Sequence, residues 1–192
     1  TTGAGIVGPK ILTPAGKIWS AGGVIDKKRF TAGLIGLGEA DGGQYGVNKN
    51  VNFISGTAML VKREVFEKIG LLDECYFLYY EDVDFCQKAQ RAGFKVVLAP
   101  KAVIVHQESA SVGKNSGLKE YYLARNHWLF LEKWASAWVK IREMARLPKT
   151  IGEHCDRGEK EALRGIKDYF WGRFKIYLIV SSCSSCPSWF IV

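Results

Sequence analysis

An acidic cluster in the middle of the chain has the residue types that acid–base chemistry requires. Glu81, Asp82 and Asp84 lie within four positions, and His106 follows twenty-four positions after Asp82. The partial positive charge of a helix N-terminus would keep Asp82 ionised. Such a carboxylate can accept a proton from a hydroxyl while that oxygen attacks an electrophilic carbon. The like charges of Glu81 and Asp84 shift the pKa of Asp82 in the opposite direction, so the sequence leaves that pKa open.

Each of these residues also has an ordinary structural interpretation. An aspartate at a helix start is commonly an N-cap, and Asp84 and Lys88 have the spacing of an ion pair across one helical turn. A lone histidine at a strand end, such as His106, commonly makes a structural hydrogen bond, although it can also bind a metal or a phosphate. Taken singly, each of these residues favours the structural interpretation over the chemical one.

The N-terminal part of the chain predicts strands followed by a loop. Two short strands within residues 5–26 are joined by the turn residues TPAG, which predicts a hairpin. Residues 31–50 contain six glycines and few apolar anchors, so we expect a surface loop that serves as a lid or a linker. The apolar segment that follows surrounds Gly56, where the missing side chain allows close approach by a backbone or a ligand.

The middle of the chain alternates helices and strands. Helices are expected at residues 63–69 and 82–92, followed by two short strands at 95–100 and 102–106 with a turn at Pro100. This alternation favours an α/β fold over a helical bundle.

Basic and aromatic residues gather in the C-terminal part. We expect one long or two broken helices over residues 119–144 and an amphipathic helix over 160–175. The net charge of +8 would suit nucleic acid, an anionic membrane or a phosphorylated ligand. No nucleic-acid motif is present and the acidic cluster interrupts any basic stripe, so we do not expect nucleic-acid binding.

The remaining features define the compartment and the domain organisation. Five cysteines do not form a disulfide framework, which indicates a reducing compartment, and Cys183 and Cys186 lack the second ligand pair of a zinc site. No leader peptide and no apolar run of about 20 residues is seen. We expect three regions, at 1–118, 119–176 and 177–192, and the last has no predicted structure.

The order of motifs along the chain resembles the family 2 glycosyltransferases, particularly their rhamnosyltransferase-like branch. The similarity runs through SGTAMLVKREVFEKIGLLDECYFLYYEDVDFCQKAQRAGFKVVLAPKAVIVH, with GIVGPKILTPAGKIWSAGGVI before it and YYLARN after it. It implies a GT-A fold, in which a Rossmann-like nucleotide-binding half precedes an acceptor-binding half. It also implies inverting transfer of a sugar from a nucleotide-diphosphate donor to a hydroxyl, in the synthesis of surface polysaccharide or glycolipid.

The resemblance also implies a role for individual residues. Glu81 and Asp82 match the catalytic-base motif, with Asp82 as the base, and His106 matches a histidine that helps to hold the metal or the diphosphate. The expected cofactor is a divalent cation, Mg or Mn, in the intact enzyme. The remaining matches are expected to bind substrate, and they are Gly56, Thr57 and Ala58 near the sugar and acceptor, Asp84, and Arg125 with Asn126 near the phosphates.

The chain departs from the family pattern at its N-terminal side. The family's nucleotide-binding strands and Asp-x-Asp motif find no match, which amounts to on the order of 100 residues, about one mononucleotide-binding half. We therefore expect an incomplete GT-A domain, with an open sheet edge, that neither binds a nucleotide sugar tightly nor transfers sugar alone. Micromolar binding of UDP, GDP or dTDP in calorimetry would contradict this expectation.

The expected partners are a nucleotide-sugar donor and a glycan or lipid-linked acceptor, in the cytoplasm or at the inner face of the cell membrane. The alternative hypothesis is a non-catalytic module that binds an anionic membrane or a polysaccharide. Its contacts would be aromatic and basic residues of the last helix, namely Arg164, Lys167, Trp171, Arg173 and Phe174. The same aromatic residues could instead pack against the rest of the domain. The sequence leaves the donor, the sugar, the acceptor and the oligomeric state open.

Overall fold

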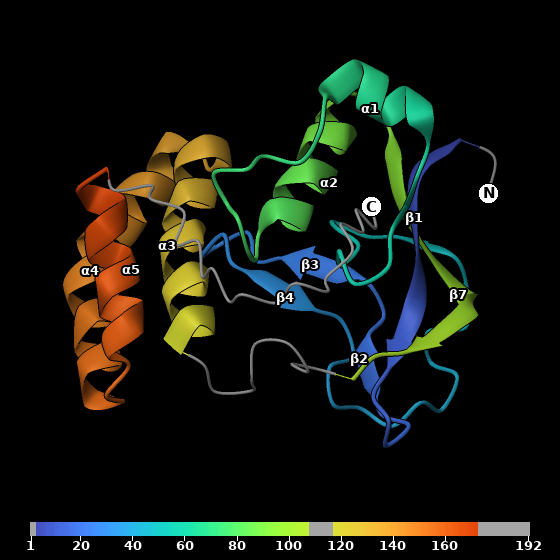
Figure 1. Ribbon diagram of the computed structural model, residues 1–192, viewed down its shortest axis with the longest axis horizontal. Helices are drawn as coiled ribbons and strands as arrows, with labels where there is room; N and C mark the ends of the chain where they lie inside the picture. Colours follow the sequence, from blue (N-terminus) through green and yellow to red (C-terminus); the bar gives the residue numbers. More distant parts are fainter. Residues whose placement is uncertain (1–2, 108–116, 173–192) are drawn as a thin grey trace, which may run out of the picture.

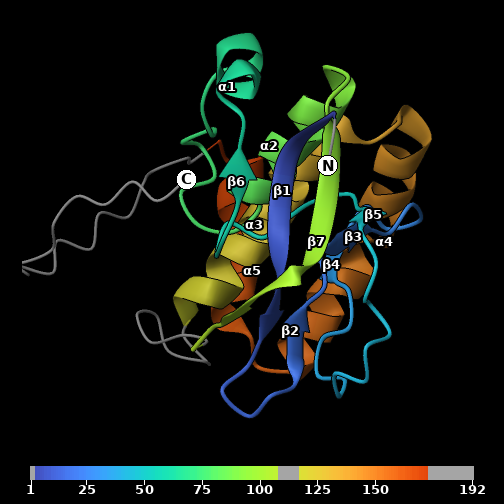
Figure 2. The ribbon, with the colours of Figure 1, turned by 90° about the vertical axis from the view of Figure 1, so that its right-hand side faces the viewer.

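Two long strands run parallel at the centre of a five-stranded sheet in the computed structural model (Figures 1 and 2). These strands are β1 (Ala4–Leu12) and β7 (Lys95–Val105). Short strands complete the sheet in antiparallel pairings: β2 (Ile18–Ser20) and β6 (Leu60–Val61) with β1, and β5 (Lys49–Asn50) with β7. The structure describes residues 3–107 and 117–172.

Strand β1 and the first half of β7 are largely buried. Ile6, Ile11, Val96 and Leu98 are all at most 1% exposed, whereas Val103 and Val105 near the end of β7 are 47% and 66% exposed. The predicted hairpin is confirmed, since β1 pairs with β2 across the TPAG turn.

The prediction of two short strands around Pro100 is wrong, because β7 is continuous. Its register with β1 passes from Pro9 opposite Ala99 to Lys10 opposite Val103. The extra residues form an irregularity that accommodates Pro100 without ending the strand, as β-bulges often do.

The glycine-rich segment at 31–50 is more regular than a loop. It contains β4 (Ala32–Leu34), which pairs antiparallel with β3 (Gly23–Ile25) in a second, two-stranded sheet, and it ends in β5. In the apolar segment that follows Gly56, Leu60–Val61 forms the short strand β6.

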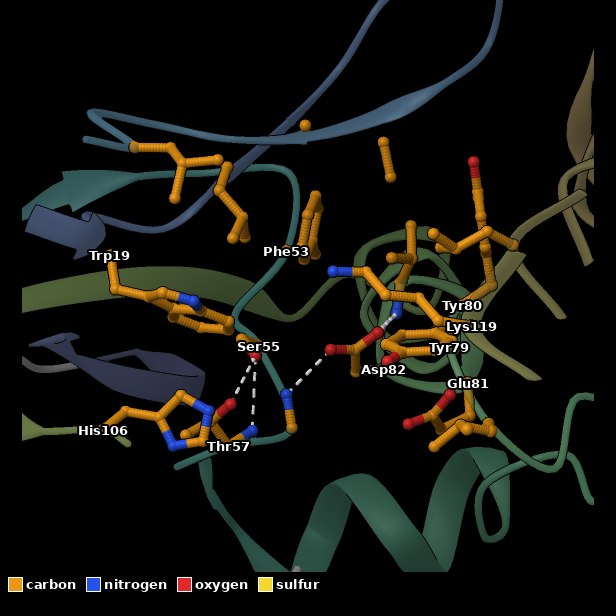
Figure 3. Close-up of a pocket in the computed structure, with 18 residues that line it drawn as sticks. Trp19, Phe53, Ser55, Thr57, Tyr79, Tyr80, Glu81, Asp82, His106 and Lys119 are labelled. Atoms are coloured by element: carbon orange, nitrogen blue, oxygen red, sulfur yellow. Dashed lines mark hydrogen bonds between the residues drawn. The ribbon is translucent and has the colours of Figure 1, made fainter. Parts of the chain in front are cut away.

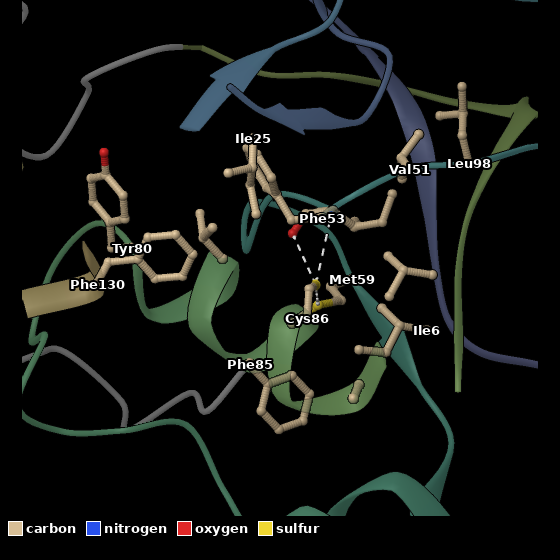
Figure 4. Packing of buried hydrophobic residues seen from close by; sticks show 14 of the residues in the cluster. Ile6, Ile25, Val51, Phe53, Met59, Tyr80, Phe85, Cys86, Leu98 and Phe130 are labelled. Carbon is tan, nitrogen blue, oxygen red and sulfur yellow. Dashed lines mark hydrogen bonds between the residues drawn. The ribbon is translucent and has the colours of Figure 1, made fainter. Parts of the chain in front are cut away.

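The two middle helices lie close to where the sequence places them. Helix α1 spans Arg63–Ile69 as predicted, and α2 spans Glu81–Arg91, one residue earlier than expected at each end. Figure 4 shows Phe85 and Cys86 of α2 beside Ile6 and Phe53 in the main core. The mixed sheet and its helices confirm the α/β class and are consistent with part of a GT-A-like domain.

Three helices form one end of the molecule in Figure 1: α3 (Gly117–Trp134), α4 (Ala137–Asp156) and α5 (Lys160–Phe170). Helices α3 and α5 approach closely at Gly165, where a Cβ atom would lie 2.3 Å from the carbonyl oxygen of Tyr121. Phe130 of α3 is fully buried in the main core, so α3 links the helical end to the sheet.

No helix in the described ranges is long and apolar enough to cross a membrane. The predicted tail at 177–192 and the residues Arg173, Phe174, Cys183 and Cys186 lie outside the described residues.

Candidate active site

A cavity of about 460 Å³ opens at the N-terminus of α2 (Figure 3). It is walled by five parts of the chain: the β2 and β4 region, the turn after Phe53, the segment that enters α2, the end of β7 and the start of α3. The lining residues are Trp19, Ala32, Gly33, Leu34, Leu37, Phe53, Ser55, Gly56, Thr57, Leu78, Tyr79, Tyr80, Glu81, Asp82, Val83, His106, Lys119 and Leu123.

Asp82 lines this cavity with both carboxylate oxygens held by backbone amides. Oδ2 accepts a hydrogen bond from the amide of Gly56 at 2.7 Å, and Oδ1 accepts one from the amide of Val83 at 2.8 Å. Burial raises the pKa of Asp82, while these amide hydrogen bonds lower it. The N-cap interpretation of Asp82 is wrong, because Tyr80 is the N-cap of α2, although the second bond does stabilise a free amide of the first turn. The bond to Gly56 ties the Asp82 carboxylate to the turn after Phe53, on the wall of the cavity.

Glu81, the neighbouring carboxyl, has a different environment. Its Oε2 atom is buried and has no hydrogen-bond partner among the described residues. Burial, followed by the charge of Asp82, raises the pKa of Glu81 to about 7. Near neutral pH the pair therefore favours a protonated Glu81 beside an ionised Asp82, because the amides of Gly56 and Val83 both stabilise the charge of Asp82.

The Gly56 segment forms a tight turn facing Asp82. Ser55 Oγ lies 3.1 Å from Thr57 Oγ1 and accepts a hydrogen bond from the Thr57 amide, and the Ala58 amide bonds back to the Ser55 carbonyl. A Cβ atom at Gly56 would lie 3.5 Å from the Cβ of Asp82. Gly56 and Thr57 line the cavity, whereas Ala58 does not.

His106 lines the same cavity at the end of β7. Its ring packs edge-on against Trp19, with ring centroids 4.9 Å apart, and its amide donates to the Leu12 carbonyl at 2.8 Å. No group of three His, Cys, Asp or Glu side chains that could hold a metal ion occurs within residues 3–107 and 117–172. The residues present therefore do not fit a metal site, because His106 would be a single ligand.

Asp84, expected to bind substrate, is fully buried on the other side of α2. Its Oδ1 accepts hydrogen bonds from Tyr76 Oη at 3.1 Å and Trp134 Nε1 at 2.6 Å and lies 2.8 Å from Lys133 Nζ. Its Oδ2 pairs with Lys88 Nζ at 3.0 Å, as the spacing predicted. Asp84 therefore joins α2 to α3 and does not line the cavity.

Arg125 and Asn126 are also fully buried, so in this structure neither side chain is open to a phosphate. Asn126 Nδ2 lies within hydrogen-bond distance of three carbonyl oxygens, those of Tyr76 at 2.9 Å, Leu78 at 2.8 Å and Tyr79 at 2.7 Å. Arg125 donates to the carbonyls of Cys75 and Tyr76 and, through Nε, to Asn126 Oδ1 at 2.8 Å. Both residues act on the backbone of the segment that leads into α2.

That segment has an unusual backbone conformation. Phe77, Tyr79 and Tyr80 have positive φ values of 60°, 64° and 73°, a region that bulky side chains rarely adopt. Each such residue costs of the order of 1–3 kcal/mol and persists only where surrounding contacts hold it. Arg125 and Asn126 supply those contacts, and Tyr80 is followed directly by Glu81 and Asp82.

Sequence reasoning missed the apolar and aromatic walls of the cavity. The run FLYY immediately before the acidic pair was a usable signal for Tyr79 and Tyr80. The one-turn spacing of Lys119 and Leu123 was another, since both lie on the first turns of α3. The contributions of Trp19 and Leu34 depend on strand pairing and had no local signal.

Comparison with known proteins places this site within a family. The model of the family described as "Glycosyltransferase like family 2" matches residues 42–130, which include every site residue expected from the sequence. Residues 42–130 belong to a glycosyltransferase family 2 domain. The match covers the Gly56 turn, all of α2 and β7, and the part of α3 that carries Arg125 and Asn126.

Curated relatives agree with this assignment. A Mycobacterium tuberculosis protein named N-acetylglucosaminyl-diphospho-decaprenol L-rhamnosyltransferase is 35% identical over 91 residues, which are 46% of this chain and 29% of that protein. The Haloferax volcanii low-salt glycan biosynthesis hexosyltransferase Agl10 is 28% identical over 130 residues, 67% of this chain and 42% of its own length. The Shigella flexneri dTDP-rhamnosyl transferase RfbF is 32% identical over 99 residues, 47% of this chain and 33% of its own. The chain thus spans less than half the length of each of these relatives.

Proposed function

We propose that this chain carries the acceptor-activating part of a site for inverting sugar transfer, with Asp82 as the general base. The observation that supports this most strongly is the position of Asp82, which lines the cavity with both oxygens held by amides. A base must be held within reach of the proton that it removes. Two backbone hydrogen bonds hold Asp82 in this way. Both donors are amide N–H groups, which do not give up their proton to the carboxylate.

In the proposed reaction the oxygen of an acceptor hydroxyl attacks the anomeric carbon of the donor sugar. A new carbon–oxygen glycosidic bond forms as the bond from that carbon to the diphosphate oxygen breaks, and the electron pair leaves with the diphosphate. The proton of the acceptor hydroxyl passes to Asp82. Attack from the face opposite the leaving group inverts the anomeric centre.

The neighbouring residues have supporting roles in this proposal. Protonated Glu81 leaves a single negative charge in the pair near neutral pH, which keeps Asp82 available as a base. Lys119 and His106 are the basic side chains of the cavity lining, and they are suited to contact the diphosphate. The divalent cation expected for the intact enzyme stays a prediction, and His106 is its one candidate ligand among the described site residues.

We further propose a hexose or rhamnose donor and an acceptor in surface-glycan synthesis. The names of the relatives support this, since they include two rhamnosyltransferases, one with a diphospho-decaprenol acceptor, and a hexosyltransferase of glycan biosynthesis. The cavity lining is mainly apolar and aromatic, which suits stacking against a sugar ring or contact with a lipid-linked acceptor. The free thiols of Cys75, Cys86 and Cys155 fit a reducing, cytosolic compartment.

The test is Asp82→Asn in an active polypeptide that contains this chain. We expect kcat for sugar transfer to fall by about 10²–10⁴-fold, the usual contribution of a general base, while nucleotide binding changes little. Asp156→Asn is the matched control, because Asp156 is an exposed aspartate at the end of α4. Full turnover by the Asp82 variant would remove Asp82 from the base role.

A further inference from the structure

The outward face of α4 is apolar along its whole length. Trp138 is 71% exposed, Ile141 62%, Met144 48% and Ile151 38%. Ala145 and Pro148 lie on the same face and are also exposed. With 3.6 residues per turn, these positions form one continuous stripe. Contiguous apolar surface of this kind on a folded domain usually marks an interaction site.

The inward face of α4 buries few side chains against the rest of the domain. Of its twenty residues only Val139 and Glu143 are classed as buried. Helices in proteins are stabilised mainly by burying an apolar face against the rest of the fold. In α4 the larger apolar face points away from the protein, so another surface is needed to cover it.

Charges border this face with a predominance of positive sign. Lys140 lies on one side of the stripe, and Arg142 and Lys149 lie on the other. Glu143 is buried and pairs with Arg142 at 3.3 Å, and Glu153 pairs with Arg146 at 3.2 Å, so the border charge of the stripe rests mainly on Lys140 and Lys149. Asp156, at the last position, is the remaining acid.

We propose that the outward face of α4 docks on an anionic lipid surface. Apolar side chains would enter the boundary between headgroups and acyl chains, and the bordering lysines would contact anionic headgroups. Trp138 has an apolar ring system with one N–H, which suits the headgroup level. The proposal deepens the proposed function, because it would bring the enzyme to the surface that carries a lipid-linked acceptor.

A lipid surface fits this face better than a helix of a second copy does. Coiled-coil partners need a narrow seam with regular knobs-into-holes packing. The α4 stripe is broad, and it includes Pro148 and Gly152, which provide no regular knob.

The α5 surface that the sequence suggested for membrane binding is covered only on its aliphatic side. Ala162 and Ile166 are buried, and Ile166 packs in a cluster with Trp128 of α3. Lys167 lies over the Trp171 ring at 4.8 Å. Phe170 and Trp171 are 42% and 61% exposed, so α5 exposes an apolar patch that is shorter than the face of α4.

Co-sedimentation with vesicles tests the proposal. We expect the chain to sediment with vesicles of phosphatidylcholine and phosphatidylglycerol and to do so much less with phosphatidylcholine alone. Ile141→Ser combined with Met144→Ser should weaken partitioning about tenfold or more. Lys140→Glu combined with Lys149→Glu should remove the preference for the anionic vesicles.

Matched controls distinguish binding through the outward face of α4 from nonspecific adsorption to vesicles. Leu60→Ser and Leu71→Ser change residues that are 75% and 73% exposed elsewhere, and they should leave sedimentation unchanged. Asp82→Asn should also sediment like the parent chain. The vesicles contain neither donor nor acceptor, so this binding does not depend on the proposed chemistry.

Two results would overturn the proposal. One is sedimentation of the α4 apolar variant equal to that of the parent chain. The other is absence of vesicle binding by the parent chain, together with a dimer in light scattering that the α4 variant converts to a monomer; this would assign the face to a second copy. Quenching of tryptophan fluorescence by brominated lipid, lost in Trp138→Phe, provides a second readout in the folded protein.

Discussion

The two sides of the first turn of α2 place the same chemical group in opposite settings. On the cavity side, the carboxylate of Asp82 accepts hydrogen bonds from two backbone amides. On the side that faces α3, the carboxylate of Asp84 contacts Lys88, Lys133 and the indole of Trp134. The residues are two positions apart and identical in type.

The difference shows that surroundings assign the role of each carboxylate. Asp84 pairs with two lysines, so its carboxylate is engaged in holding α2 against α3. Asp82 has no such cation among its hydrogen-bond partners, and burial raises its pKa, so it can accept a proton from a substrate. One aspartate fastens helices together and the other is available for chemistry.

The largest effect on stability should come from Asp84→Ala. It would leave Lys88 and Lys133 beside an empty, buried position, and breaking a buried pair in this way costs about 3–5 kcal/mol. Urea unfolding should show this loss. Asp82→Ala should cost much less, because it removes no cation's partner, and an equal loss for the two variants would break the contrast between the two sides of α2.

Asn126→Ala should have the next largest effect. The substitution removes the amide that holds three carbonyls of the strained segment at 76–79, and we expect a loss of about 2–4 kcal/mol from unsatisfied acceptors. Leu123→Ala, one turn earlier on α3, is the control for stability because Leu123 is 37% exposed.

Asn126 also offers a functional readout. If the segment relaxes, Asp82 loses its position, and kcat for transfer should fall more than the affinity for nucleotide does. A folded Asn126→Ala protein with normal kcat would show that the strained backbone does not position Asp82.

The smallest effect concerns pH and Glu81→Gln. The pKa of Glu81 is raised to about 7 in the folded protein, above its ordinary value of 4.5. The folded state therefore holds a proton that the unfolded state releases between these values, so stability falls as pH rises through this window and levels off above it.

In Glu81→Gln this dependence should disappear. We expect the variant to be more stable than the parent chain by about 2 kcal/mol at pH 7.5, with little difference at pH 4. The gain at pH 7.5 is smaller than the full pKa shift implies, because the Glu81 side chain is not wholly enclosed. Denaturant unfolding at the two pH values measures the change. A parent chain with flat stability between them would contradict the assigned protonation of Glu81.

Local patterns predicted the helices well and the long-range strands less well. The spacing of apolar residues in Arg63–Ile69 and in α2 specifies helices, because it brings together side chains three and four residues apart. The sequence predicts two strands in place of β7, because a proline such as Pro100 ordinarily ends a strand. The structure shows a register shift against β1 instead, which depends on a partner about ninety residues earlier in the chain.

The sequence by itself determined the α/β class, the α2 helix and the family to which the motifs belong, because these follow from local periodicity and an ordered pattern of residues. Only the tertiary structure decided which carboxylate faces the cavity, that Arg125 and Asn126 bind backbone carbonyls, and that the longer exposed apolar face belongs to α4. The physical reason is that charge, burial and hydrogen bonding depend on residues brought together from distant parts of the chain. Asp82 and Asp84 differ because Gly56 lies beside one and α3 beside the other.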